Sequence, residues 1–241
     1  MLLAGLVWSD GRRMDKAGSQ LSIDAPLEVS PGRRFVGRGA EKLGPALARF
    51  AIAAAGRDAL DVGASTGGFT QVLLEAGAAR VIALDVGHGQ LDWSLRNDAR
   101  VHVLEGVNAR YLDPEALPFR PSLATIDVSF ISLRQVLERT CACLTPGADV
   151  VALAKPQFEV GKGRVGKGGI VRDPLAWDEV LDGLIVFARE RGLGPQDVAR
   201  SALPGASGNV EFFLHLRPSS EPAAPSTLDA FRREAVDAPL P

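Results

Sequence analysis

The chain is poor in cysteine and in aromatic residues, and it has no long apolar run. Its 241 residues include two cysteines, three histidines and one tyrosine. Two cysteines exclude a disulfide framework, and Cys141 and Cys143 would point in different directions on a helix, so we expect inert thiols rather than metal ligands. No stretch reaches the ~20 apolar residues that a membrane span needs. We therefore expect a cytoplasmic protein with no metal site and no membrane contact.

Charge is nearly balanced, which excludes a histone-like polycation but leaves nucleic acid open as a substrate. The 27 Lys and Arg against 29 Asp and Glu give a formal net charge of −2. Local patches decide nucleic-acid binding, and basic residues are in excess over 1–50 and 155–172. The second segment contains a flexible Gly-rich loop with Lys162, Arg164 and Lys167, which suits contacts to phosphates. Aromatic residues are few, so base stacking would rest on residues such as Phe35 or Phe158.

Composition and periodicity divide the chain into three zones. Residues 1–30 have the pattern of short strands, with a hairpin turn at Asp10-Gly11. Residues 31–218 alternate apolar strands with amphipathic helices, which predicts a mostly parallel α/β sheet with helices on both faces. The last two of these strands are joined by a short loop and should pair antiparallel. Residues 219–241 are rich in Pro, Ala and Ser and are predicted to be a flexible tail, with at most a short helix over 228–236.

Within the central zone the expected elements follow each other with short connections. The predicted strands are Ala59–Val62, Arg80–Asp85, Val101–Leu104, Leu123–Val128, Asp149–Ala154, Val198–Ala202 and Val210–Leu216. The predicted helices are Gly44–Ala55, Phe69–Ala76, Gln90–Arg96, Leu133–Cys143 and a helix that Asp173 caps and that runs to about Arg191.

A Gly-rich turn after the first strand of this sheet indicates a nucleotide-like ligand. The turn from Asp61 to Phe69 reads D-V-G-A-S-T-G-G-F, and its glycines let a ligand approach the backbone closely. Ser65 stands where the dinucleotide fingerprint needs its second glycine, and no lysine follows Gly68 as a phosphate loop requires. Asp61 precedes the first glycine and suits the amino group of S-adenosylmethionine better than a pyrophosphate.

Two further polar residues follow the next strands. Asp85 ends the second strand and is well placed to hold ribose hydroxyls, as it would be for several cofactors. Asn108 follows the third strand and is either an adenine contact or a turn-forming residue.

Charged residues at the ends of three later strands suggest catalysis. Asp127 closes the fourth strand, Lys155 closes a fifth strand that reads V-V-A-L-A, and Glu211 begins the last strand. Adjacent strand ends meet at one edge of a sheet, so Lys155 and Asp127 form either a structural ion pair or a catalytic site. Partial burial, or a second cation such as Lys42, favours a neutral amine that can remove a proton from a hydroxyl.

Eight blocks in order resemble the TlyA family of rRNA 2′-O-methyltransferases, also known as hemolysins, which have an FtsJ-like catalytic domain. The resemblance covers roughly residues 33–217 and rests on R-R-F-V-G-R-G-A-E-K-L, D-V-G-A-S-T-G-G-F-T, D-V-G-H-G-Q-L, N-A-R, T-I-D-V-S-F-I-S-L-R, K-P-Q-F-E-V-G, K-G-G-I-V-R-D-P and G-N-V-E-F-F-L-H-L. The chain departs from the family at Gly37, Ala40 and His88, where family members usually have Ser, Gly and Tyr.

The resemblance implies a Rossmann-like class I S-adenosylmethionine-dependent methyltransferase that methylates the ribose 2′-hydroxyl of rRNA, with cytidine in either ribosomal subunit as the target. We expect a monomer that needs no metal. The implied catalytic tetrad is Lys42, Asp127, Lys155 and Glu211. The expected cofactor-binding residues are Asp61, Gly63, Ser65, Gly67, Gly68, Phe69, Asp85, Val86, Asn108 and Asp127. The expected RNA-binding residues are Arg34, Arg38, Lys162, Arg164 and Lys167.

The first zone resembles only the second half of a small RNA-binding module that family members share with a ribosomal protein. Half a module has too little core to fold alone, so we expect either a misassigned start, which we favour, or a remnant that packs on the catalytic domain. Three other functions remain open. They are an amino-group methyltransferase, suggested by D-V-S-F, a non-catalytic RNA-binding or ribosome-assembly factor, and a cytolytic hemolysin.

Overall fold

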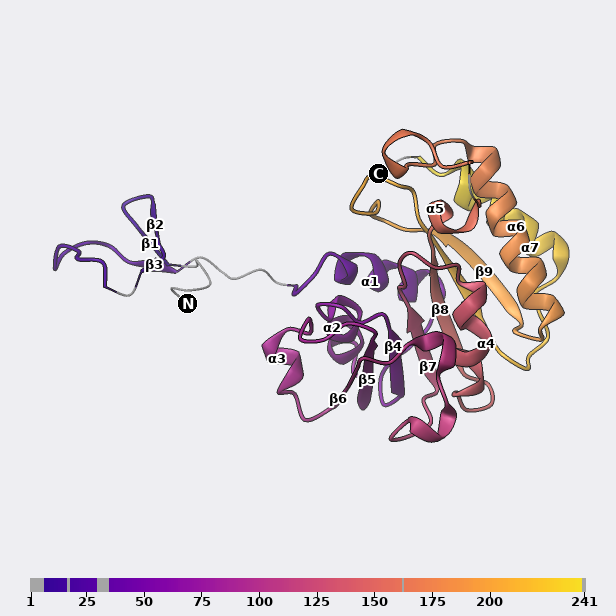
Figure 1. The fold of residues 1–241 in the computed structure, drawn as a ribbon, viewed down its shortest axis with the longest axis horizontal. Coiled ribbons are helices and arrows are strands. Elements are labelled where there is room, and N and C mark those ends of the chain that lie inside the picture. Colours follow the sequence, from indigo (N-terminus) through magenta and orange to yellow (C-terminus); the bar gives the residue numbers. More distant parts are fainter. Residues whose placement is uncertain (1–6, 17, 30–34, 162, 240–241) are drawn as a thin grey trace. The chain divides into compact units, whose positions relative to one another are not determined.

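The computed structural model describes residues 7–16, 18–29, 35–161 and 163–239. The chain forms two units, Met1–Val36 and Gly37–Pro241 (Figure 1). In the first unit a three-stranded antiparallel sheet has the order β2-β1-β3, with β1 (Val7–Ser9), β2 (Arg12–Met14) and β3 (Glu28–Val29). The β1–β2 turn has positive φ at both Asp10 (48°) and Gly11 (72°), as a tight hairpin requires, which confirms the predicted turn.

The second unit is built on a seven-stranded sheet with the order β6-β5-β4-β7-β8-β10-β9. Strands β4 to β8 pair in parallel, and β10 pairs antiparallel with both β8 and β9. This is the predicted α/β sheet with an antiparallel last strand. Its strands are β4 (Asp58–Val62), β5 (Arg80–Asp85), β6 (Val101–Glu105), β7 (Leu123–Ile126), β8 (Asp149–Ala154), β9 (Pro195–Arg200) and β10 (Phe212–Leu216).

Helices cover both faces of this sheet, with α1 and α2 on one side and α4 and α6 on the other (Figure 1). The α-helices are α1 (Gly39–Arg49), α2 (Gly68–Glu75), α3 (Trp93–Arg96), α4 (Arg134–Ala142), α5 (Pro156–Glu159), α6 (Pro174–Glu190) and α7 (Pro225–Asp237). Short 3-10 turns are η1 (Ala109–Tyr111), η2 (Pro114–Ala116) and η3 (Lys167–Gly169). No helix in the described part of the chain is long and apolar enough to cross a membrane.

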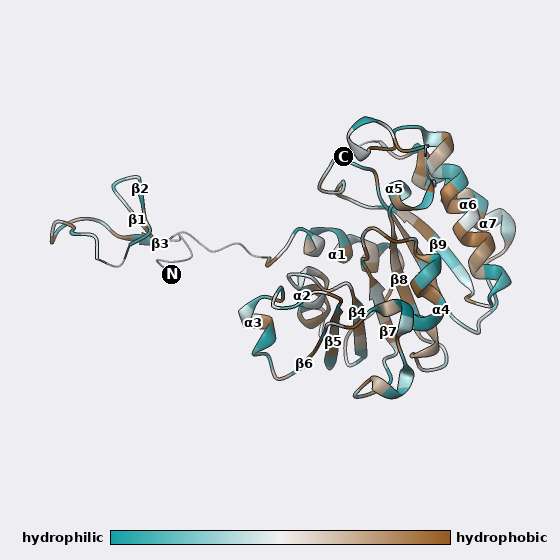
Figure 2. Ribbon diagram, viewed as in Figure 1, coloured by the Kyte–Doolittle hydropathy of each residue, from teal (hydrophilic) through white to brown (hydrophobic). Residues whose placement is uncertain are grey.

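The sheet is the centre of the hydrophobic core. Every residue of β8 is buried, as expected for an apolar strand between two neighbours, and Val150, Ala152 and Ala154 contribute to one contiguous cluster. In Figure 2 the central strands carry the hydrophobic colour, whereas the outer surfaces of α4 and α6 carry polar residues. Asp173 caps α6, accepting a hydrogen bond from Leu175 N at 3.0 Å, as the sequence predicted.

The first helix of the second unit begins five residues earlier than predicted. Pro45 lies inside α1, which runs from Gly39 to Arg49, so the residues before Gly44 are already helical. The helix ends before Ala51, whose φ of 53° is left-handed, rather than at Ala55.

The C-terminal segment is not the flexible tail that its composition predicted. It contains a thirteen-residue helix, α7, which begins at Pro225 rather than after Thr227. Leu228 and Ala235 are buried and Phe231 packs against the core cluster. These residues are spaced by three, four and seven positions along one face, so α7 is amphipathic and buries that face.

Candidate active site

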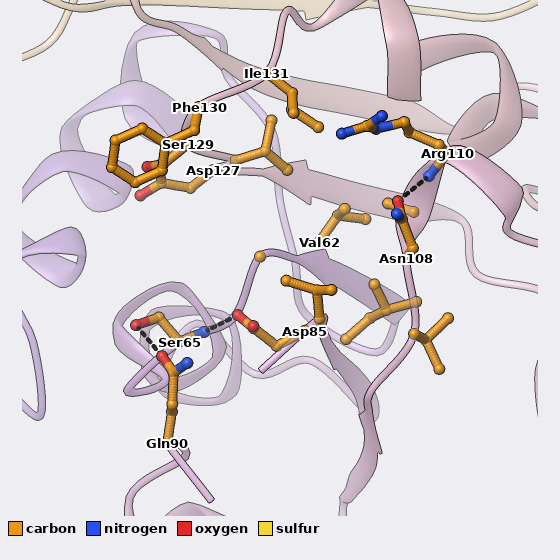
Figure 3. A pocket seen from close by; sticks show the side chains of 16 residues that line it. Val62, Ser65, Asp85, Gln90, Asn108, Arg110, Asp127, Ser129, Phe130 and Ile131 are labelled. Carbon is orange, nitrogen blue, oxygen red and sulfur yellow. Dashed lines mark hydrogen bonds between the residues drawn. The ribbon is translucent and has the colours of Figure 1, made fainter. Parts of the chain in front are cut away.

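A cavity of about 570 Å³ lies at the carboxyl ends of β4, β5, β6 and β7 (Figure 3). Ligands bind at this edge of an open parallel sheet, where the strand order reverses between β4 and β7. Figure 3 shows Asp127 and Phe130 on one side of the cavity and Asp85, Ser65 and Gln90 on the other. Six of the predicted cofactor-binding residues line it, namely Gly63, Ser65, Asp85, Val86, Asn108 and Asp127.

The Gly-rich turn forms the floor of the cavity because its first glycine allows two strand ends to meet. Gly63 has a φ of +84°, and a Cβ there would lie 2.4 Å from the backbone oxygen of Asp127. A side chain at Gly63 would therefore separate β4 from β7. Ser65 N then donates to Asp85 Oδ2 at 2.8 Å, which joins the turn to the end of β5.

Asp85 is fixed by the backbone on both oxygens. Its Oδ2 accepts from Ser65 N, and its Oδ1 accepts from Gly87 N at 2.7 Å. Each carboxylate oxygen has a second lone pair, so Asp85 can still accept hydrogen bonds from two ligand hydroxyls. Asn108 lines the cavity and also caps η1, because its Oδ1 accepts from Arg110 N at 3.1 Å, so its turn-forming role is confirmed and its adenine contact stays a prediction.

Asp61 and Gly67 do not line this cavity, although the sequence placed both at the ligand. Asp61 has no exposed surface, and it accepts hydrogen bonds from Thr70 Oγ1 at 2.7 Å and Thr125 Oγ1 at 3.0 Å. Burial raises the pKa of Asp61 to about 7, although the two threonine hydrogen bonds lower it. Asp61 therefore supports the turn from beneath.

Gly67 serves the packing of the turn. Its φ is +97°, and a Cβ there would lie 2.2 Å from Leu95 Cδ1 and 2.8 Å from Leu91 Cδ1. Gly68 and Phe69 line a second cavity of about 130 Å³, whose lining also includes Gly39 and Asp127. The N-terminal end of α1 is therefore in direct contact with the turn.

The four residues of the implied tetrad form two ion pairs at one edge of the sheet. Lys155 Nζ lies 2.5 Å from Asp127 Oδ1 and donates to Ser129 Oγ at 2.9 Å. Lys42 Nζ lies 2.7 Å from Glu211 Oε2, and both side chains of this pair are almost completely buried. Lys42 thus meets Glu211 even though Ala40 stands where the family has a glycine.

Strand register explains why these pairs lie side by side. Phe212 of β10 pairs with Ala154 of β8, so Glu211 and Lys155 occupy the next positions on two adjacent strands. On the other side of β8, Ile126 of β7 pairs with Ala152, so β7 ends beside β8 and the carboxylate of Asp127 can contact the Lys155 side chain. The reversed direction of β10 is what brings the start of that strand to the carboxyl ends of the others.

Sequence reasoning missed several residues that line the cavity, above all Gln90, Arg110, Ser129 and Phe130. Phe130 has a left-handed φ of 65°, and 86% of its surface is exposed. Such a conformation is costly for a bulky residue and is concentrated at functional sites. Its ring lies 5.2 Å from that of Phe158, so the two rings form an aromatic pair beside Lys155. In the sequence, the signal for Phe130 was its place at the end of the motif D-V-S-F, which begins with Asp127.

The predicted RNA-binding residues have varied surroundings. Arg38 donates to the backbone oxygen of Pro204 at 3.0 Å, and Arg164 pairs with Glu179 at 2.6 Å, so each guanidinium is partly committed within the chain. Lys167 begins η3 and is exposed. Arg34 and Lys162 lie outside the described residues.

The two cysteines are not reactive nucleophiles. Burial raises the pKa of Cys141 to about 12 and that of Cys143 to about 11, so both thiols are protonated at neutral pH. Over the described ranges there is no group of three or more His, Cys, Asp or Glu side chains that could hold a metal ion.

Comparison with known proteins agrees with this geometry. Residues 35–218 match the model of the FtsJ-like methyltransferase family. The chain is 50% identical over 240 residues to the 16S/23S rRNA (cytidine-2′-O)-methyltransferase TlyA of Mycobacterium tuberculosis, covering 98% of this chain and 90% of the relative.

Solved structures give the same result at the level of the fold. A protein of Streptococcus thermophilus described as a hemolysin superposes with a TM-score of 0.79 at 40% identity, covering 97% of this chain and 87% of the other. The N-methyltransferase NodS of Bradyrhizobium japonicum, in complex with S-adenosylhomocysteine, superposes with a TM-score of 0.52 at 13% identity, covering 73% and 85%, and so shares the fold alone. This chain belongs to the FtsJ-like methyltransferase family and is a methyltransferase of the TlyA type.

Proposed function

We propose that this chain transfers a methyl group from S-adenosylmethionine to the ribose 2′-hydroxyl of a cytidine in rRNA. The observation that carries the proposal is the pair of lysine–carboxylate contacts, Lys155 with Asp127 and Lys42 with Glu211, at neighbouring strand ends beside a ligand-sized cavity. The relative from Mycobacterium tuberculosis is named for the same reaction on 16S and 23S rRNA.

The cavity fits S-adenosylmethionine in size and in chemistry. Its volume of about 570 Å³ is within the roughly 300–1,000 Å³ range of small-molecule sites. Asp85 offers free lone pairs to ribose hydroxyls, while Asp127 lines both cavities and presents a carboxylate to a cationic ligand. Val86 and Ile131 supply apolar surface for a purine ring. When bound, this cofactor supplies an activated methyl group on a sulfonium.

Lys155 is the residue that we assign to the substrate hydroxyl. Asp127 and Ser129, which both line the cavity, hold its amine from two directions, so the ammonium group is fixed directly behind the cavity wall. A positioned amine can orient the hydroxyl in line with the methyl group and accept or relay the proton that leaves. The carboxylate of Asp127 balances the lysine charge while that proton moves.

The second pair supports the first. Lys42 is buried against Glu211, and Glu211 is next to Lys155 in the register of β8 and β10. We assign Lys42 to the charge balance around Lys155, because its ammonium offsets the carboxylate of Glu211 beside that lysine. Glu211 holds Lys42 in that place.

Methylation of isolated ribosomal subunits tests the proposal directly. Purified protein, labelled S-adenosylmethionine and small or large subunits that lack the modification should give close to one methyl group per target site. Primer extension sensitive to 2′-O-methylation should place that group on a cytidine ribose. Lys155→Met should abolish transfer while cofactor affinity, measured by calorimetry, stays within twofold, and Arg233→Met is the matched control at an exposed cation outside the cavity.

Other outcomes would identify the competing functions. Cofactor and rRNA binding without methyl transfer to either subunit would indicate an RNA-binding or assembly factor and would refute the proposal. A methyl group on a base nitrogen would indicate an amino-group methyltransferase. Release of dye from liposomes by nanomolar protein would support the cytolytic activity after which the Streptococcus thermophilus relative is named.

A further inference from the structure

The C-terminal helix faces the helix that carries Lys42, across a groove whose lining shares no residue with the large cavity. The groove has a volume of about 270 Å³ and is lined by α1, β9, β10 and α7. Lys42, Ala46 and Arg49 of α1 line one wall, and their spacing of four and three residues puts them on one helix face. Glu234 and Ala235 of α7 line the wall opposite.

Arg49 connects the two walls. Its Nη2 lies 3.4 Å from Glu234 Oε2, and its guanidinium carbon lies 5.2 Å from the centre of the Phe231 ring, so two residues of α7 hold it. Its Nη1 pairs with Asp197 Oδ2 of β9 at 2.8 Å. The end of α1 is therefore fixed both to the sheet and to α7.

Arg200, the last residue of β9, fixes the other end of this contact. Its Nε donates to the carbonyl oxygen of Ala235 at 2.9 Å, and its Nη1 and Nη2 donate to those of Ala238 and Val236. The last carbonyls of a helix have no partner within the helix and attract cations. One guanidinium thus holds the end of α7 against the edge strand.

Helix α1 needs such support near Lys42. Pro45 lies inside the helix and has no N–H to donate to the carbonyl of Glu41, so one bond of that turn is missing. The helix has only eleven residues and would be marginal by itself. Contacts with its neighbours therefore decide where the Lys42 ammonium lies.

We propose that α7 is a strap that positions Lys42. By holding Arg49 through Phe231 and Glu234, and by being held itself through Arg200, α7 keeps α1 where the Lys42 ammonium meets Glu211. Phe231, Glu234 and Arg200 are positioning residues in this arrangement. The expected effect on turnover rests on the proposed function, whereas the effect on Lys42 does not.

Chemical labelling of Lys42 tests the strap without any turnover. Native protein is treated with formaldehyde and a borane reductant, and dimethylation of each lysine is measured by peptide mass spectrometry. The side chain of Lys42 is 9% exposed, whereas Lys167 is exposed and serves as the internal standard. We expect labelling of Lys42 to rise at least fivefold in Arg200→Gln and about twofold in Glu234→Gln.

Controls separate positioning from general destabilisation. Arg233→Gln changes an exposed cation on the same helix and should leave Lys42 labelling unchanged. Glu234→Gln changes a side chain that is 67% exposed, so that variant should fold even if Arg200→Gln does not. Unchanged Lys42 labelling in the folded Glu234→Gln variant, or an equal rise in Arg233→Gln, would overturn the strap.

Kinetics then separates the strap from the proposed reaction. In Arg200→Gln we expect kcat for methyl transfer to fall about tenfold with the Kd for S-adenosylmethionine within twofold, and Arg200→Lys to restore part of the loss. If labelling of Lys42 is faster in Arg200→Gln and Glu234→Gln but wild type transfers no methyl group, the strap is supported and the proposed function is refuted. Normal methyl transfer by wild type, together with unchanged labelling of Lys42 in every variant, would support the proposed function and refute the strap.

Discussion

The two edges of the central sheet both carry buried charge, but they use it differently. At the amino edge, Asp149 begins β8 and contacts His215 Nε2 at 2.9 Å, Arg57 Nη1 at 2.7 Å and Arg217 Nε at 3.0 Å. Burial opposes the ionisation of Asp149, yet these three hydrogen bonds outweigh it and hold its pKa well below its usual range.

At the carboxyl edge, the same strand is followed by a lysine with fewer partners. Lys155 has one carboxylate and one hydroxyl, and Asp127 and Ser129, which hold it, also line the cavity. A carboxylate whose lone pairs are filled by neighbours contributes to stability, whereas a cation left with a free direction can act on a ligand. We therefore expect changes at the carboxyl edge to affect turnover and changes at the amino edge to affect folding.

The largest expected effect is the loss of turnover in Lys155→Met. We expect methyl transfer to fall about 10³-fold, which is within the range of a removed general acid or base and corresponds to about 4 kcal/mol. The midpoint of thermal unfolding should change much less, because methionine fills the volume of the buried lysine side chain and the partly exposed Asp127 stays accessible to water. If the loss of turnover in Lys155→Met were matched by an equal loss of folded protein, the carboxyl edge would affect folding in the same way as the amino edge.

Asp61 should give a large pH effect on stability. Its folded pKa of about 7 is above the unfolded value of 3.8, so its stabilising contribution is complete below pH 4 and is lost as the pH rises through 7. The loss amounts to at most about 4 kcal/mol. Asp61→Asn should remove this pH dependence, as urea unfolding at pH 4.5 and pH 8 would reveal.

The difference in unfolding free energy between wild type and Asp61→Asn should therefore shift against wild type as the pH rises from 4.5 to 8. A constant difference would mean that Asp61 ionises normally in the folded state, and the support that we assign to it beneath the turn would need another explanation.

Asp149→Asn should cost about 3 kcal/mol of stability, because it leaves His215, Arg57 and Arg217 around a neutral group. Urea unfolding at pH 7 measures the loss. The affinity for S-adenosylmethionine should stay within twofold, since the change is at the opposite edge from the cavity. A matched drop in affinity at a temperature where the variant is folded would contradict that separation.

The smallest effect is expected from Ser129→Ala. This change removes one hydrogen bond to Lys155 but keeps the ion pair with Asp127. We expect kcat to fall about tenfold, equivalent to about 1.4 kcal/mol, with stability unchanged. A variant with full activity would show that Asp127 alone orients the lysine.

Much of the site was predictable because its residues stand at strand ends. The apolar runs of β7 and β8 predicted where each strand stops, and the residues that follow, Asp127 and Lys155, therefore had to meet at one edge. Lys42 could not be found this way, since it lies on a helix before the sheet; the sequence offered it as a candidate second cation, and its place in a tetrad came from the family resemblance.

The features that the sequence did not predict have physical causes that are not visible in local sequence. Asp61 is inside β4, where alternation decides which face a side chain takes, and its contacts with Thr70 and Thr125 depend on tertiary packing. The left-handed conformation of Phe130 has no signature in a non-glycine residue. Composition hid α7, because Pro and Ala dominate a segment whose few apolar residues share one face.

The reversal of β10 has a consequence for how this scaffold can be altered. In a wholly parallel sheet every connection that returns to the amino edge is remote from the ligand. Here β9 ends and β10 begins at the carboxyl edge, beside the proposed active site, so residues 201–211 form a hairpin connection there. Surface connections tolerate insertions, and one made at 206–208 would add new chain within reach of Glu211 without interrupting any strand. This connection is therefore the natural point at which to graft a new substrate preference onto an unchanged catalytic core.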